Sequence, residues 1–268
     1  MTGIIQAAPG GLSTLSGGTR TAVKTERPWQ VRLKVSETHA SCPLCSRQQL
    51  DEHFPADGWK TFRNSNTPWP YHRLLIPTNC WPIDKLWSLG GKETVLAGML
   101  QLAIDDVLRT RQQQLYPIWI YTHIGYGAGQ NFAHHHWHIT SPADKPKPLI
   151  IPDDAVKLWD NKRLNTYLCG VRAGQALIVQ KKRMRFSDYL ANNLAEESSR
   201  LVEIFNKKFC KPDYCLFFAF HSEMEWYARY TPILNNWGGS EFAALDVGTP
   251  FVLPWPHEAT RDFLLGRT

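Results

Sequence analysis

The chain has 268 residues, of which 43% are hydrophobic and 20% charged, a composition typical of a folded globular protein. Its 30 lysines and arginines outnumber its 24 acidic residues, which gives a net charge of +6. These basic residues are spread along the sequence, so they favour a site for small anions, and we expect no nucleic-acid partner. No segment predicts a membrane span or a secretion signal. Six cysteines in such a chain favour a reducing, cytoplasmic environment.

Elements follow one another in a recognisable order. Residues 1–26 are rich in Gly, Ser and Thr, and we expect a flexible N-terminal arm. A Cys-x-x-Cys pair follows at 42–45, then a strand in HRLLIP, then a helix over 93–113 whose apolar residues recur at helical spacing. YPIWIYTHIG is typical of a strand, GYGAGQ of a glycine turn, and NFAHHHWHI of a second strand.

The same order returns in weaker form after the Pro- and Lys-rich connection SPADKPKP. GQALIV predicts a strand, residues 187–209 an amphipathic helix with Ser187 as its N-cap, and CLFFAFH and MEWYARYTPIL two further strands. We therefore predict an α+β fold of two fused units, residues 27–145 and 146–268, each a curved antiparallel sheet with a packed helix. In the second unit, Glu225, Tyr227 and Arg229 take the position of the histidine strand.

The stretch HHHWHI, residues 134–139, is the densest group of histidines. In a strand, His134, His136 and His138 would share one face, and Trp137 and Ile139 would face the core. Three imidazoles on one face suit metal binding, nucleophilic or acid/base chemistry, or anion binding. Binuclear hydrolases with an HxHxDH pattern need an aspartate where Trp137 stands, so a catalytic metal pair is disfavoured.

Nucleophilic catalysis on phosphorus fits this face best. A neutral imidazole that is held at one ring nitrogen can attack a phosphoryl group with the other, and a second acceptor then resolves the phosphoramidate. His136 is the natural nucleophile. We expect His138 to donate to a phosphate oxygen or to assist the leaving group, and backbone N–H groups of the glycine turn to bind the nonreacting oxygens.

The cysteines indicate a second type of site. Cys42 and Cys45 are spaced so that both thiolates can reach one tetrahedral ion. With Cys80 and His134 they would make a closed Cys3His site, which predicts a structural Zn²⁺. The alternative is that the three cysteines are buried free thiols.

The stretch HIGYGAGQNFAHHHWHI, residues 123–139, resembles the signature of the histidine-triad superfamily. The Cys-x-x-Cys pair, the two copies and the ending WPHEATRDFLL resemble its galactose-1-phosphate uridylyltransferase branch. This resemblance implies a nucleotidyltransferase or phosphorylase that acts on a nucleoside diphosphosugar or a dinucleoside polyphosphate through a nucleotidyl-His136 intermediate. Phosphate or a sugar phosphate would be the acceptor. A homodimer is also implied, as is the zinc site above.

By position, the resemblance also assigns contacts to the nucleotide and its phosphates. These residues are Asn64, Asn66, His123, Gly129, Gln130 and Asn131. Of the first two, either could contact the ribose or base. The third member of the triad is a histidine, as in hydrolases of the superfamily, where the transferases usually have glutamine. Two alternatives therefore stay open: a nucleotide hydrolase with water as the acceptor, and a zinc-stabilised nucleotide-binding protein without catalysis.

Overall fold

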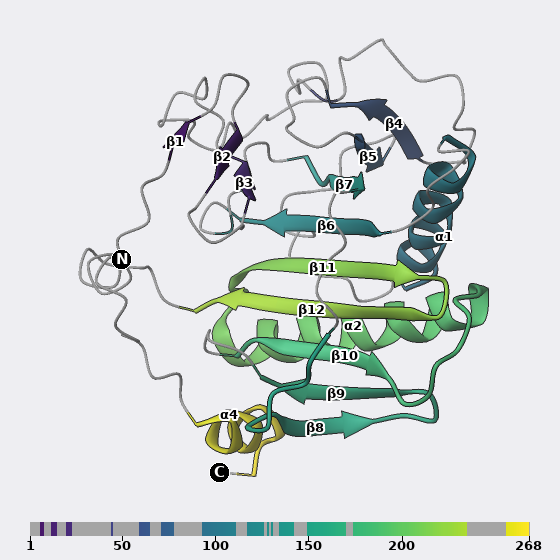
Figure 1. Cartoon of the computed structure of the whole chain (residues 1–268). Coiled ribbons are helices and arrows are strands. Elements are labelled where there is room, and N and C mark those ends of the chain that lie inside the picture. The colour runs from purple at the N-terminus through teal and green to yellow at the C-terminus, as the bar shows by residue number, and fades with distance from the viewer. Residues whose placement is uncertain are drawn as a thin grey trace.

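The computed structural model describes residues 59–64, 71–77, 93–110, 117–125, 134–141, 149–169, 174–234 and 256–267, with Leu44, Ala128, Gln130 and three short N-terminal strands. Nine of its strands are β4 (Trp59–Arg63), β5 (Tyr71–Pro77), β6 (Ile118–Ile124), β7 (Trp137–Ser141), β8 (Val156–Asp160), β9 (Leu164–Leu168), β10 (Ala176–Gln180), β11 (Asp213–Ser222) and β12 (Glu225–Ile233). They form one antiparallel sheet in the order β4-β5-β7-β6-β11-β12-β10-β9-β8 (Figure 1).

The described helices are α1 (Glu93–Thr110), α2 (Asp188–Phe209) and α4 (His257–Leu265). In Figure 1, α2 runs across one face of the sheet behind β12, β10 and β9, and α1 packs beside it over β6. The predicted N-cap is confirmed, since α2 begins directly after Ser187, whose backbone is extended. The helix ends at Cys210, which adopts the left-handed conformation common at helix C-termini.

The sheet is continuous where we expected two separate sheets. β6 pairs with β11 at its centre, from Ile118↔Phe220 to Ile124↔Tyr214, and this pairing joins the two halves. Outward from that pair, the order β6-β7-β5-β4 on one side matches β11-β12-β10-β9 on the other. In chain order, the helix lies between the second and third strands of each set of four, so α1 follows β5 and α2 follows β10. The coarser prediction, an antiparallel α+β fold, is confirmed.

Side chains alternate between the two faces of the sheet. The face under the helices carries the main core, which includes Trp137 and Ile139, 1% and 0% exposed, as the sequence predicted. The opposite face carries His138 and, on neighbouring strands, His72 and Tyr121. The helices thus fill one face, and the histidines are held on the other.

The histidine strand is shorter than predicted. β7 begins at Trp137, so His134 and His136 precede the strand that we expected to contain them. At His134 and His136, side chains replace the backbone hydrogen-bond partners that a neighbouring strand would supply. The carbonyl oxygen of His136 accepts a hydrogen bond from Thr122 Oγ1 at 2.7 Å. The carbonyl oxygen of His134 is bound by the ring of His136 itself.

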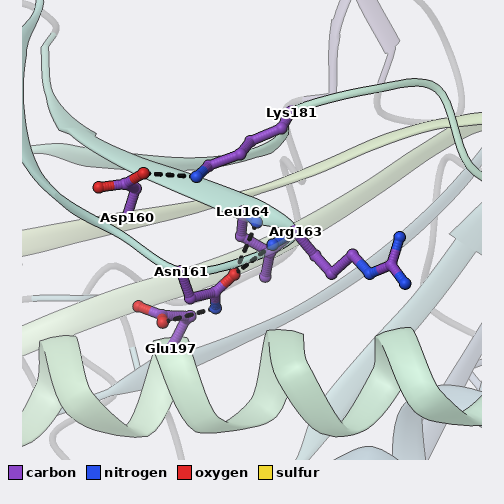
Figure 2. Close-up of polar contacts among 6 residues, drawn as sticks. All are labelled: Asp160, Asn161, Arg163, Leu164, Lys181 and Glu197. Atoms are coloured by element: carbon purple, nitrogen blue, oxygen red, sulfur yellow. Dashed lines mark hydrogen bonds and ion pairs between the residues drawn. The ribbon is translucent and has the colours of Figure 1, made fainter.

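Strands β8 and β9 were not predicted, because their connecting turn lacks glycine and proline. Asn161 forms that turn instead: its Oδ1 accepts the backbone N–H groups of Arg163 and Leu164 (Figure 2). Residues 1–26, expected to be a flexible arm, contain β1 (Gln6–Ala7), β2 (Leu12–Thr14) and β3 (Arg20–Ala22), which pair antiparallel as a small sheet of their own.

Candidate functional site

His136 lies immediately before β7 and is held at one ring nitrogen. Its Nδ1 is 2.8 Å from the carbonyl oxygen of His134. A carbonyl only accepts, so Nδ1 carries the proton and the ring's lone pair is on Nε2. The residue is 6% exposed, and its ring lies edge to face with the imidazole of His138 at 5.2 Å. In its neutral form the ring can therefore act as a nucleophile through Nε2.

The glycine turn before the triad is closed by Gln130. Its side-chain oxygen accepts the backbone N–H of Gly125 at 2.7 Å, and its own backbone N–H donates to the carbonyl oxygen of Gly125 at 3.1 Å. Its amide nitrogen lies 3.5 Å from the carbonyl oxygen of His134. Gln130 therefore joins the turn to the carbonyl that holds His136. Its predicted contact with phosphate stays a prediction.

His138 is fixed by two neighbouring strands. Its ring stacks on Tyr121 of β6 with centroids 4.7 Å apart and an interplanar angle of 8°. On β5, His72 Nε2 lies 2.8 Å from His138 Nδ1. Asn64, directly after β4, places its Nδ2 3.5 Å from each ring nitrogen of His72. Asn64 therefore reaches the triad through His72.

His123 faces the same site from β6. Its Nδ1 lies 3.0 Å from the Sγ of Cys215, its partner in register on β11. Burial, and secondarily the repulsion that would arise if His136 were protonated as well, lower the pKa of His123 from 6.5 to about 4. His123 is thus neutral at physiological pH and can bind a substrate oxygen through a ring N–H without adding charge.

The structure brings together several residues that the sequence singled out: Asn64, His123, Gln130, His134, His136 and His138. The others lie outside the described residues, namely Asn66, Gly129, Asn131, Cys42, Cys45 and Cys80. Sequence reasoning missed His72, Tyr121 and Cys215 as site residues. Strand alternation could have placed them on the histidine face, but only once the strand order was known.

Of the four residues predicted to bind zinc, the structure describes His134. It is 2% exposed, and its Nε2 lies 3.2 Å from the carbonyl oxygen of Pro77, three residues before Cys80. Leu44, which lies between Cys42 and Cys45 in the sequence, packs in a cluster with Ile76, the residue before Pro77 on β5. Within the described ranges no group of three or more metal-ligating side chains gathers, and the three cysteines are not among them.

The fold is shared with solved structures of an ADP-glucose phosphorylase and a uridylyltransferase. An ADP-glucose phosphorylase from Arabidopsis thaliana, solved with bound ADP-glucose, superposes with a TM-score of 0.60 at 12% identity over 79% of this chain and 83% of its own. A uridylyltransferase gives 0.58 at 12% identity over 93% and 95%.

A DUF4931 family protein from Bacillus cereus also superposes, with a TM-score of 0.58 at 14% identity over 81% of this chain and 100% of its own. No protein-family model and no curated protein matches the sequence. Among the described helices none is long and apolar enough to cross a bilayer.

Proposed function

We propose that this protein is a nucleotidyltransferase or phosphorylase that transfers a nucleoside monophosphate through His136. The observation that carries the proposal is the 2.8 Å contact between His136 Nδ1 and the carbonyl oxygen of His134. This contact fixes the tautomer in which Nε2 is the nucleophile. The neighbouring imidazole of His138 supplies a donor at the place where charge develops on the phosphoryl oxygens.

The reaction would proceed in two displacements. In the first, the lone pair of His136 Nε2 forms a bond to the phosphorus of the nucleotidyl group, and the bond from phosphorus to the bridging oxygen breaks. The leaving phosphate or sugar phosphate departs as an anion, and the modified ring keeps its Nδ1–H on the carbonyl of His134. In the second, an oxygen of the acceptor attacks phosphorus and the P–N bond breaks, which restores the neutral imidazole.

The substrates that fit this chemistry are nucleoside diphosphosugars or dinucleoside polyphosphates, with phosphate or a sugar phosphate as the acceptor. A uridylyltransferase-like exchange belongs to the same proposal. Support comes from the fold shared with a phosphorylase that binds ADP-glucose and with a uridylyltransferase. The mild excess of positive charge suits such anionic substrates.

Intact-mass spectrometry tests the covalent step. After mixing with UDP-glucose, ADP-glucose or diadenosine tetraphosphate, the protein should gain the mass of one nucleoside monophosphate. His136→Gln should gain none, and His221→Gln, the same change at the far end of β11, should gain as much as the parent. An adduct on His136→Gln, or its turnover at the parent rate, would sink the mechanism.

Product analysis with and without phosphate, together with calorimetry, separates two alternatives. A hydrolase is favoured by His138 as the third triad member, and it would release nucleoside monophosphate whether or not phosphate is present. A phosphorylase would release nucleoside diphosphate only with phosphate. A non-catalytic nucleotide-binding protein would bind donor in calorimetry and yield neither adduct nor product.

We also propose a structural Zn²⁺ held by Cys42, Cys45, Cys80 and His134. Support comes from the burial of His134, whose Nε2 lies 3.2 Å from the carbonyl oxygen of Pro77, and from Leu44, which lies between Cys42 and Cys45 in the sequence and packs in a cluster with Ile76. When bound, the ion would tie the segment that carries Cys42 and Cys45 to the sheet.

Elemental analysis tests this site. The parent should carry one zinc per chain, and Cys42→Ser should lose it and melt at a lower temperature. Cys210→Ser, at an exposed free thiol, and His136→Gln should keep the metal. A parent purified without zinc, and unchanged in melting temperature by added Zn²⁺, would contradict the proposal.

The organisation of the chain completes the proposal. Two fused histidine-triad-like units, 27–145 and 146–268, after an arm at 1–26, account for the strand order that repeats outward from the β6–β11 pair. A cytoplasmic location agrees with the free thiols of Cys169 and Cys210. A homodimer, which the resemblance implies, would appear in light scattering as a mass of about twice 30.7 kDa.

A further inference from the structure

His72 is a histidine of the site that lies outside the sequence motif of residues 123–139. It sits on β5, is 8% exposed, and its Nε2 is 2.8 Å from Nδ1 of His138. Two neutral imidazoles at that distance share one proton: one nitrogen donates and the other accepts. The pair therefore has two states. They differ at the opposite ring nitrogen of His138, Nε2, which is remote from His72.

In the first state His138 donates from Nδ1, and its Nε2 carries a lone pair. In the second, His72 donates from Nε2, and the proton of His138 is on Nε2, where it can be given to an oxygen. Only the second state makes His138 a hydrogen-bond donor to a phosphoryl group. An anionic phosphoryl oxygen would repel the lone pair of the first state, so the partner of His138 decides whether the triad can act.

The surroundings of His72 accommodate the second state. The amide Nδ2 of Asn64 lies 3.5 Å from both ring nitrogens of His72, so it can donate to Nδ1 when Nε2 donates to His138. The backbone N–H of Asn64 also donates to the carbonyl oxygen of His72 at 2.9 Å, which holds the two residues in register. The amide of Asn64 then donates to His72, His72 donates to His138, and His138 is left with its proton on Nε2.

Packing keeps the ring of His138 in place. His138 stacks almost parallel on Tyr121, and the two are paired in register on β7 and β6. Its other in-register partner is Leu74 on β5. A ring held between two strands keeps Nδ1 toward His72, and it directs Nε2 away from His72.

We propose that His72 is a positioning residue that fixes His138 as an Nε2–H donor, with Asn64 orienting His72. The inference rests on the proposed nucleotidyl transfer, because it explains how His138 serves that reaction. It gives Asn64 a role within the protein in place of the direct nucleotide contact considered above. It also predicts which substitution at position 72 is tolerated: a donor at the place of Nε2 suffices.

The tautomer can be read without any substrate. In protein labelled with ¹⁵N-histidine, two-bond ¹H–¹⁵N spectra at neutral pH should show His138 protonated on Nε2 and His72 likewise. His72→Gln, whose amide nitrogen lies near the position of Nε2, should keep the His138 tautomer. His72→Phe should leave His138 as a mixture of both. His138 protonated on Nδ1 in the parent, or unchanged in His72→Phe, would overturn the proposal.

Single-turnover formation of the nucleotidyl adduct tests the consequence. His72→Phe and His138→Phe should each slow it on the order of a hundredfold, the loss expected for one well-placed donor. The double variant should be no slower than either single variant, since both remove the same interaction. His72→Gln should stay within a few-fold of the parent, and multiplicative losses in the double variant would refute the coupling.

The two proposals fail in different ways. If the parent forms no adduct with any donor, nucleotidyl transfer through His136 is wrong, whatever the tautomer of His138. If the adduct forms at the same rate in the parent and in His72→Phe, nucleotidyl transfer stands and the role of His72 is wrong. His221→Gln serves as the control in both experiments, because it changes a histidine on β11 that lies outside this chain of hydrogen bonds.

Discussion

Gly125 ends β6 and begins the turn that carries the triad. Its φ of +91° is disfavoured for any residue with a side chain, and an added Cβ would lie 1.8 Å from the carboxylate oxygen of Asp213. We expect Gly125→Ala to reduce the free energy of unfolding by about 1–3 kcal/mol from backbone strain alone. Urea denaturation measures the loss, and adduct formation should fall with it because the turn supports Gln130.

Gly98 offers a matched control in α1. An added Cβ there meets nothing within 4 Å, and helix interiors favour alanine over glycine. Gly98→Ala should therefore raise the free energy of unfolding by up to about 1 kcal/mol and leave the site unchanged. Equal effects of the two substitutions would show that the turn does not require glycine.

The burial of His123 makes a prediction about acid. Its pKa is about 4 in the folded protein against an ordinary value of 6.5, so the unfolded chain takes up a proton over a pH range in which the native one does not. Stability is therefore lost as pH falls from 6.5 to 4, by up to about 3 kcal/mol. His123→Asn should flatten the dependence of the urea midpoint on pH in that window. Parallel curves for variant and parent would contradict the assignment.

The residues of the site were only partly predictable from sequence. His136 and His138 could be chosen because a dense histidine motif after a glycine turn has few other uses. Cys215 and His72 could not be chosen, since their roles depend on which strands pair with β6 and β7. The partner of His138 comes from a strand 66 residues away in the chain, and such a pairing leaves no local signal.

At the scale of elements, one buried carboxylate joins α2 to the second half of the sheet. Glu197 is 6% exposed; its side chain accepts the indole N–H of Trp159 and, at 2.8 Å, the amide of Asn161 (Figure 2). Nearby, Lys181 pairs with Asp160 at the surface, where solvent weakens ion pairs. The buried contact, rather than the exposed pair, therefore fixes the β8–β9 hairpin against the helix.

Glu197→Leu should destabilise the protein by about 2–4 kcal/mol, because it leaves the buried indole N–H of Trp159 and the half-buried amide of Asn161 without this acceptor. Glu197→Gln keeps one acceptor oxygen and should cost less than half as much. Glu196→Gln, on the exposed side of the same helix, should change the free energy of unfolding by less than about 0.5 kcal/mol. Chemical denaturation followed by tryptophan fluorescence measures all three. A Glu197→Leu variant as stable as the parent would show that the carboxylate is not structural.

Elements with strong local signals were predicted well. The helical spacing of apolar residues located α1 and α2, and the N-cap at Ser187 marked where α2 begins. β8 and β9 were missed because a side-chain turn at Asn161 replaces the usual glycine. The predicted histidine strand began too early, before Trp137, where β7 starts. The alternation of polar and apolar residues does not show where side chains replace the backbone hydrogen bonds of a sheet.

At the scale of the whole molecule, the central question is whether the halves fold as one. The sheet is continuous through the β6–β11 pair, and the main core contains residues of both halves. Phe218, on β11, is 0% exposed and its ring contacts Trp137, which follows His136 directly in the chain. The second half thus supports the histidine segment of the first, although the sequence suggested two separate sheets.

This arrangement predicts a single unfolding transition. Phe218→Ala should lower the free energy of unfolding by about 3–5 kcal/mol, the cost of removing a buried ring from a packed core. Phe217→Ala, one residue away on the half-exposed face, should cost less, although its ring stacks on Tyr121. Far-ultraviolet circular dichroism and the histidine resonances of the site should report the same midpoint in each variant. A sheet continuous through β6 and β11 cannot lose one half without exposing the core of the other. A site that stays folded after the second half has melted would therefore contradict this prediction and show two independent units.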